Sequence, residues 1–267
     1  MQELLSKIQE SAASLGADDP LIPSTDAYTT TICYLGSKSL SHTLSQIERC
    51  KDRLLAIGPQ SEAARRQIIS SVMEYWSEKP GVGVAVVDKL LNYTILTPSS
   101  VIHWALVDQL SKGQNLAKAH IYEIVASTIS KVTGRVRQVV IARNAPDLPS
   151  EQRNILDETL TMERSEVAQL FIHMEDALIG VAEGSNDVMV EGANQNMEQE
   201  EMLRTWGRRW LRVMKRKRGV EESWVEERLQ LGKGQMEGVE GGIESAMPSR
   251  NGVIATPRKA EDMDEIS

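Results

Sequence analysis

The sequence is poor in aromatic residues, in cysteine and in long apolar runs. Aromatic residues make up only 4% of the chain, which has one phenylalanine, Phe171, and five tryptophans. The core must therefore be mainly Leu, Ile, Val and Ala, which favours helix-on-helix packing. Cys33 and Cys50 lie inside helical patterns, so reduced thiols are expected rather than a disulfide framework. No apolar run approaches the roughly 20 residues of a membrane-spanning helix, and residues 1–16 lack the apolar region of a signal peptide.

The motifs of common catalytic and metal sites are also missing. No HExxH, Cys-x-x-Cys, GxSxG or GxxxxGK(S/T) sequence occurs. No histidine has a Glu three positions before it, which excludes the motif of di-iron bundles. The isolated histidines are His42, His103, His120 and His173. The adjacent carboxylates Asp157-Glu158 and Glu175-Asp176 point apart on a helix and cannot act as a pair. The sequence therefore predicts a protein that is not an enzyme, with no cofactor and no metal site.

Three short amphipathic helical patterns follow one another between residues 61 and 106, with almost no loop between them. Breaks at residues 79–81 and 96–98, each containing a proline, separate them. Ser61 can cap the first pattern, and Thr97 can cap the third, which then begins with proline at a position where the missing N–H costs nothing. Helices this short cannot bury their apolar faces alone and must stack on neighbours. We therefore expect an all-α stack of helical hairpins, of the armadillo or HEAT kind.

Two longer patterns predict one long antiparallel helical hairpin over about residues 116–182. Apolar residues in the first arm alternate spacings of four and three, a coiled-coil-like seam, and the second arm returns after a turn at residues 144–149. A terminal helix rich in Trp and Arg is expected at about residues 197–229. The helical repeat domain thus covers residues 1–230. The remainder, residues 231–267, is acidic, contains scattered glycines and has no periodicity, which predicts a disordered tail.

Every charged residue from Arg204 to Arg218 is basic, although the net charge of the chain is −8. A chain with this negative net charge is not expected to bind nucleic acid non-specifically over its whole surface. The basic block is therefore a local feature. Tryptophans and arginines interleave within it. The expected apolar stripe of this helix consists of Leu203, Trp206, Trp210, Val213 and Met214. The candidate residues for binding a partner or RNA are Trp206, Arg208, Arg209, Trp210, Arg212 and Lys215.

Two interpretations of the basic block stay open. In the structural one, the tryptophans seal the end of the helical stack and the arginines pair with acids such as Glu175 or Asp176. In the functional one, the helix holds a partner protein or RNA phosphates, because Trp and Arg dominate interface hot spots and Arg binds phosphate through two N–H groups. The run Lys215–Arg218 also has the composition of a nuclear import signal, and a solvated helix end explains it equally well.

Several stretches carry a resemblance to one known family, in order and without large gaps. They are SKSLSHTLSQIERCKDRLLAIGP (37–59), most of residues 65–106, AKAHIYEIVASTISKVTGRVRQVV (117–140), LFIHMEDALIGVAEGSND (170–187) and WGRRWLRVMKRKRGVEESWV (206–225). Together they resemble the third helical domain of the large subunit of the nuclear cap-binding complex, fungal type. The likeness covers roughly residues 1–230. The family's large subunit has three such domains and this sequence matches only the last, and animal members have a longer charged insertion in place of the turn at residues 144–149.

The resemblance implies a non-catalytic scaffold. In that family a small subunit with an RNA-recognition fold reads the RNA cap by stacking its guanine between aromatic rings, and the large subunit grips and orders the small one. Capped RNA is then an indirect partner, and no membrane is involved. The resemblance also implies a nuclear protein that shuttles to the cytoplasm and serves mRNA export, splicing and nonsense-mediated decay.

A second class of function stays open beside this one. The chain could be a free-standing helical adaptor of translation or RNA metabolism in the cytoplasm. The wider class of such adaptors includes the middle domain of translation initiation factor 4G, to which the expected fold is akin. Both classes act through contact surfaces on stacked helices, so the fold alone does not separate them.

Overall fold

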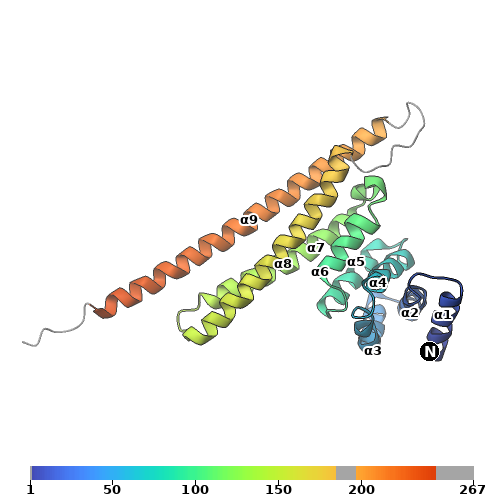
Figure 1. The fold of residues 1–267 in the computed structure, drawn as a ribbon, viewed down its shortest axis with the longest axis horizontal. Coiled ribbons are helices and arrows are strands. Elements are labelled where there is room, and N and C mark those ends of the chain that lie inside the picture. The colour runs from blue at the N-terminus through green and yellow to red at the C-terminus, as the bar shows by residue number, and fades with distance from the viewer. Residues whose placement is uncertain (1, 185–196, 245–267) are drawn as a thin grey trace, which may run out of the picture.

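The computed structural model describes residues 2–184 and 197–244, and within these ranges every regular element is a helix (Figure 1). The elements are α1 (Gln2–Ser14), α2 (Leu21–Gly36), α3 (Leu40–Ile57), α4 (Glu62–Tyr75), α5 (Pro80–Asn92), α6 (Pro98–His103), the π-helix η1 (Trp104–Asp108), the 3-10 helix η2 (Ser111–Ala117), α7 (Ala119–Arg143), α8 (Ser150–Glu183) and α9 (Met197–Glu244). The predicted all-α fold is confirmed. Among the helices so described, none combines the length and the apolar character that crossing a bilayer requires.

Local capping starts α4 and α6 where the sequence predicts. The Ser61 hydroxyl accepts a hydrogen bond from the backbone N–H of Ala64 at 3.1 Å. Thr97 and Ser100 cap each other's backbone, since each side-chain oxygen accepts from the other residue's N–H at 3.1 Å. Such caps satisfy N–H groups that have no partner inside the helix, and each stabilises the fold by about 1 kcal/mol.

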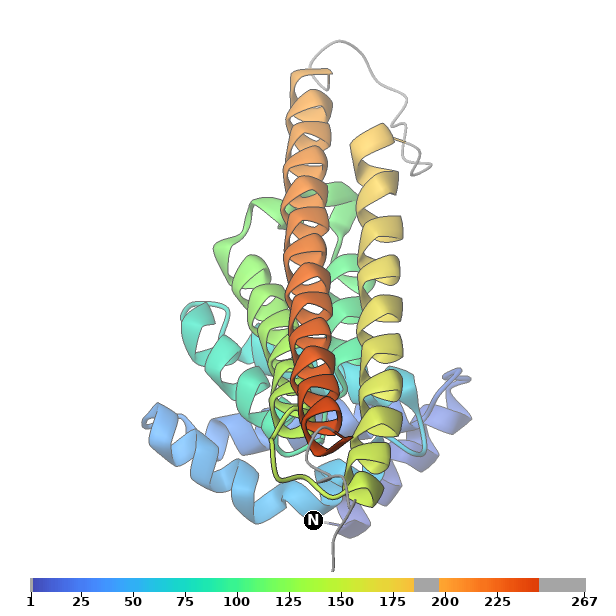
Figure 2. The ribbon, with the colours of Figure 1, turned by 90° about the vertical axis from the view of Figure 1, so that its left-hand side faces the viewer.

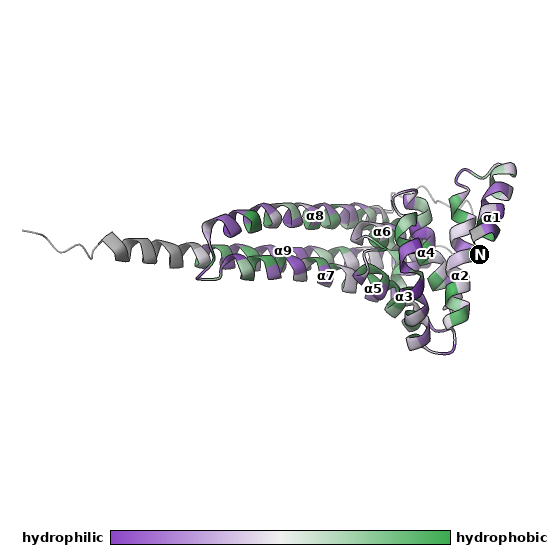
Figure 3. Cartoon of the chain, turned by 90° about the horizontal axis from the view of Figure 1, so that it is seen from below, coloured by the Kyte–Doolittle hydropathy of each residue, from purple (hydrophilic) through white to green (hydrophobic). Residues whose placement is uncertain are grey.

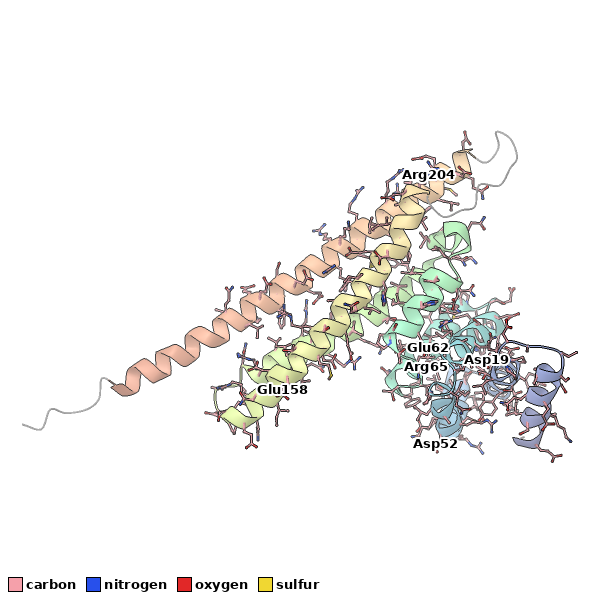
Figure 4. The ribbon with its side chains drawn as sticks, in the orientation of Figure 1. Asp19, Asp52, Glu62, Arg65, Glu158 and Arg204 are labelled. Carbon is pink, nitrogen blue, oxygen red and sulfur yellow. The ribbon has the colours of Figure 1, made fainter. Side chains whose placement is uncertain are left out.

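One carboxylate joins the starts of two neighbouring helices. Asp19 accepts from the backbone N–H of Leu21 at 2.9 Å, at the first turn of α2, and also from the hydroxyl of Ser61. Figure 4 shows Asp19 close to Glu62 and Arg65, which form an ion pair of 2.8 Å on α4. Because Ser61 itself caps α4, this network fixes where α2 and α4 begin relative to each other.

The main core lies where the short helices meet α7 and the inner sides of α8 and α9. Its side chains are mostly aliphatic, as the composition predicts, and Phe171 is buried among them. The largest fully buried side chains are Leu5, Leu54, Ile68, Ile69, Leu90, Ile95, Leu96, Leu106, Ile124, Ile129, Phe171 and Met174. In Figure 3, hydrophobic residues recur along α8 and α9 between hydrophilic ones, as in helices that bury one side.

The long helices α7, α8 and α9 form a three-helix bundle that extends away from the short helices (Figures 1 and 3). Arg137 of α7 binds Glu221 of α9 at 2.7 Å, and Asn144 donates to the carbonyl of Arg228 at 2.8 Å. Both pairs are separated by 84 residues in the sequence, so α7 and α9 run parallel in a constant register. The intervening α8 runs the opposite way, which confirms the predicted antiparallel hairpin.

The position and length of α9 differ from expectation. The sequence suggested a helix of about residues 197–229 that seals the end of the stack, whereas α9 lies lengthwise on the hairpin and continues to Glu244 (Figure 2). A second small core of Val136, Val140, Leu160 and Val225 holds the part of the bundle far from the short helices. The first part of the predicted disordered tail is therefore helical, and only the backbone is described for residues 233–244. Residues 245–267 lie outside the described residues.

Both cysteines are free thiols, as expected. Cys33 is buried and Cys50 is half-buried. Burial raises the pKa of the Cys33 thiol to about 11, and the nearby indole of Trp76 opposes that shift. At neutral pH the Cys33 side chain is therefore protonated and acts as a small apolar group in the core.

The crossing of α8 and α9 depends on one glycine. A Cβ atom added to Gly207 would lie 2.9 Å from the backbone nitrogen of Ala182 and 3.0 Å from a methyl of Val181. Backbone atoms cannot move aside cheaply, so only glycine allows the two helices to approach this closely. By contrast, a Cβ added to Gly219 in the same helix would meet no atom within 4 Å.

Two alanine substitutions in α9 should therefore have opposite effects. Gly207→Ala should lower the free energy of unfolding by about 1–3 kcal/mol, because it overpacks the α8–α9 crossing. Gly219→Ala should raise it by up to about 1 kcal/mol, because alanine favours the helix and meets no obstacle. Chemical denaturation of both variants measures the difference. Equal effects would show that the close approach at Gly207 does not hold in solution.

Candidate functional site: the outer side of helix α9

Trp210 is a structural residue of the bundle. Its side chain is only 4% exposed, and its indole N–H donates to the carbonyl of Leu116 at 3.0 Å. Its ring stands edge-on to Tyr122 of α7 with the centroids 5.3 Å apart. A buried indole with a satisfied N–H cannot reach a partner, so the binding role considered for Trp210 is replaced by a packing role.

Trp206 lies at the border between core and surface. It is half-buried against the main core, and the guanidinium of Arg209 sits over its ring at 5.6 Å from the centroid. The cation–π contact orients Arg209 along the helix and leaves its charge facing solvent. Trp206 therefore contributes to stability on one side and supports an exposed arginine on the other.

The cations at the start of α9 are partly engaged by acids of the same helix. Arg208 donates to Glu201 and to the Thr205 hydroxyl, the latter at 3.2 Å. Arg204 lies 3.9 Å from Glu200, and Figure 4 places Arg204 near the beginning of α9, beside the end of α8. Exposed pairs of this kind contribute little to stability and exchange readily for other partners.

Three cations in the middle of α9 form the most open part of the basic block. Arg212, Lys215 and Arg216 are exposed, and none of them makes an ion pair or hydrogen bond with another described residue. Spacings of three and four residues place them on one side of the helix. This side faces away from α7 and α8, so the outer side of α9 carries positive charge that the chain itself does not neutralise.

The last two cations of the block turn back to the bundle. Lys217 donates to the Ser130 hydroxyl of α7 at 3.3 Å. Arg218 binds Glu222 at 2.8 Å and Glu175 of α8 at 3.5 Å. The expected pairing of arginines with Glu175 is thus confirmed for Arg218 alone and does not apply to Arg208, Arg209 or Arg212. The block therefore combines a structural part with an exposed part.

The side of α9 that is buried was only partly predicted. Val213 was expected beside the tryptophans on the apolar stripe, but its side chain is 43% exposed. Trp210 and Met214 of the expected stripe are buried, together with Gly207, Val225 and Gly232. A glycine inside the helix marks this side at Gly207, but Gly219 in the same helix meets no neighbour, so the sequence alone does not tell the two apart.

One groove beside the hairpin is electrostatically balanced, in contrast to α9. It has a volume of about 1050 Å³ and lies between α7, α8 and the turn that precedes α6. Its cation Arg135 lies 3.8 Å from Glu163, and Lys131 is bound to Asp88 at 3.1 Å. Within the described part of the chain, no three His, Cys, Asp or Glu side chains gather as metal ligands. Neither observation points to a catalytic centre.

A stack of short helices joined to a three-helix bundle is an all-α helical-repeat architecture. Comparison with known proteins gives the same fold class. Residues 1–223 match the family described as MIF4G like. This match covers most of the 267 residues, and the chain belongs to that family.

Part of the chain is also similar to curated proteins. It is 26% identical over 117 residues to nuclear cap-binding protein subunit 1 of Schizosaccharomyces pombe, which is 44% of this chain and 15% of the relative. It is 27% identical over 114 residues to the protein of the same name from Xenopus tropicalis, or 43% of this chain and 14% of the relative. The predicted resemblance is confirmed, and the chain matches only a small part of the length of these relatives.

The two tryptophans of the block should differ in their effect on stability. Trp210→Ala should lower the free energy of unfolding by about 3–5 kcal/mol, because it removes a buried indole and leaves the Leu116 carbonyl unpaired. Trp206→Ala should cost only about 1–2 kcal/mol, because that ring is half-buried. Urea denaturation followed by circular dichroism gives both values. A loss for Trp206→Ala as large as for Trp210→Ala would contradict the structure.

The outer arginines should be dispensable for folding. Replacing Arg208, Arg209 and Arg212 together by Ala should change the free energy of unfolding by no more than about 1 kcal/mol and leave the far-UV helical signal intact. Arg143→Ala is the matched control and should cost more, because the Arg143 side chain is largely buried against Asp157 at 2.6 Å. If the triple variant unfolded, these arginines would be needed for the fold, which would contradict the prediction.

Proposed function

We propose that this chain is a non-catalytic scaffold of a nuclear mRNA cap-binding complex and supports a small cap-reading subunit. The observation that carries the proposal is the MIF4G-like match over residues 1–223, together with relatives named as nuclear cap-binding subunits. A small subunit with an RNA-recognition fold is the partner, and capped RNA is bound through it. The proposal includes a nuclear location, shuttling to the cytoplasm, and service in mRNA export, splicing and nonsense-mediated decay.

The physical basis of the proposal is rigidity. The short helices are fixed at their starts by caps and by the Asp19 network, and the bundle is fixed by buried contacts at both ends. A rigid surface loses little conformational entropy when a partner docks. Cap reading needs a pair of aromatic rings that are free to stack on one base. All five tryptophans are buried or half-buried, and the exposed rings Tyr34 and Tyr122 lie on different helices. These features support a division of labour in which this chain orders the subunit that reads the cap.

A cap-analogue resin tests the proposal. We expect the purified chain to be retained on methylated-cap resin only when the small subunit is added, and to elute with free cap analogue. A resin carrying unmethylated GTP is the control and should retain neither protein. Retention of the chain without the small subunit, or no retention with it, would contradict the scaffold role. Retention of a translation initiation factor from cytoplasmic extract instead would favour the free-standing adaptor.

A further inference from the structure

The exposed large apolar residues of α9 up to residue 232, where its side chains are described, fall on one line. They are Met202, Val213, Val220 and Leu231, exposed by 50%, 43%, 55% and 54%. The intervals between them are 11, 7 and 11 residues. With about 3.6 residues per turn these intervals are close to three, two and three turns, so the four side chains point in nearly the same direction.

This line is separate from the side that α9 buries in the bundle. The buried positions Gly207, Trp210, Met214 and Val225 are centred about 100° around the helix from it, since each residue advances about 100°. Figures 1 and 2 show α9 at the edge of the molecule, with α7 and α8 on its inner side. The apolar line therefore has no partner among the described elements. We call it the outer stripe.

Cations accompany the outer stripe along its central turns. Arg209 follows Met202 by seven residues, and Arg216 follows Arg209 by seven, so both lie close to the same line. Arg212 lies next to them on the outward side. Beyond this basic centre the helix turns acidic, with Glu226 and Glu227 exposed. The start of α9 is acidic too, with Glu198 and Glu201 exposed, so the stripe has a basic middle between two acidic ends.

Two observations distinguish a protein partner from RNA. Binding of single-stranded RNA relies on open aromatic rings on which bases stack. The rings of α9 are not open, because Trp210 is buried, Arg209 lies over Trp206, and Trp224 has two arginines over its ring. Aliphatic side chains aligned on one side of a helix instead offer apolar contacts to a second helix that lies along the first.

We propose that the outer stripe of α9 binds an amphipathic helix of another protein. That helix carries apolar residues opposite Met202, Val213 and Val220 and acidic residues opposite Arg209, Arg212 and Arg216. The apolar contacts supply affinity, and the charges fix register, because an acidic segment placed opposite either acidic end of the stripe is repelled. The inference does not depend on the proposed role in cap binding.

A helical peptide library displayed on phage tests the proposal. The library holds apolar residues at heptad positions a and d and random residues at the flanking positions, and it is selected on the full-length chain. We expect enrichment of Asp and Glu at the flanks. Two selected peptides are then synthesised, and their dissociation constants for the chain are measured by fluorescence anisotropy.

Two variants and two matched controls locate the binding site. Val213→Asp with Val220→Asp, and Arg209→Glu with Arg212→Glu and Arg216→Glu, should each weaken peptide binding at least about tenfold. The controls Ile155→Asp on α8 and Arg49→Glu on α3 replace equally exposed residues elsewhere and should leave binding unchanged. Circular dichroism of each variant shows whether its fold is kept.

Four outcomes would overturn the proposal. The first is that selected peptides are not acidic, and the second is that they bind the stripe variants as tightly as the unchanged chain. The third is that an uncapped 20-nucleotide single-stranded RNA binds, loses affinity with the arginine variant, and is unaffected by the valine variant, while no peptide binds. The last is that the chain alone forms a dimer that Val213→Asp with Val220→Asp dissociates, in which case the outer stripe contacts a second copy.

Discussion

The lengthwise packing of α9 on α7 and α8 is the constraint on which the rest of the bundle depends. It rests on a close approach at Gly207, where the backbone of α8 leaves no space for a Cβ atom, and on the indole of Trp210, which donates to the Leu116 carbonyl. These contacts fix both the distance and the rotation of α9. Once the rotation is fixed, the side chains that face solvent are also fixed. The exposed surface of α9 is therefore a consequence of how its buried side packs.

This packing separates the interleaved Trp and Arg residues into two groups. Trp210 and Met214 enter the core, and Arg218 turns back to Glu175, so these residues stabilise the bundle. Arg212 and Arg216 remain on the outside without an ion pair among the described residues. The structural interpretation thus applies to the first group, and the binding interpretation stays a proposal for the second. A helix can carry them together because positions three or four apart share a side, whereas adjacent positions do not.

The predictable part of the fold is the part that local signals control. The caps at Ser61 and Thr97 begin α4 and α6, and the spacing of apolar residues marks the long hairpin, because both signals act within a few residues. The placement of α9, by contrast, depends on tertiary contacts with α7 and α8. Its apolar residues lie on more than one side, so periodicity alone grouped the exposed Val213 with the buried Trp210 and Met214. The helix also continues through glycine-rich sequence to Glu244, against the weak local propensity of those residues.

The charge of the chain acts differently at long and short range. The net charge of −8 repels other polyanions. This repulsion is weak beyond about 10 Å, because salt screens most of it. The basic centre of the outer stripe acts only on groups in contact with it. RNA approaching this surface gains phosphate contacts but little from Val213 or Val220. An acidic amphipathic helix gains both, since its apolar residues cover the exposed valines while its carboxylates meet Arg212 and Arg216. A surface of this composition on an acidic protein thus selects partners that bring apolar contact together with negative charge.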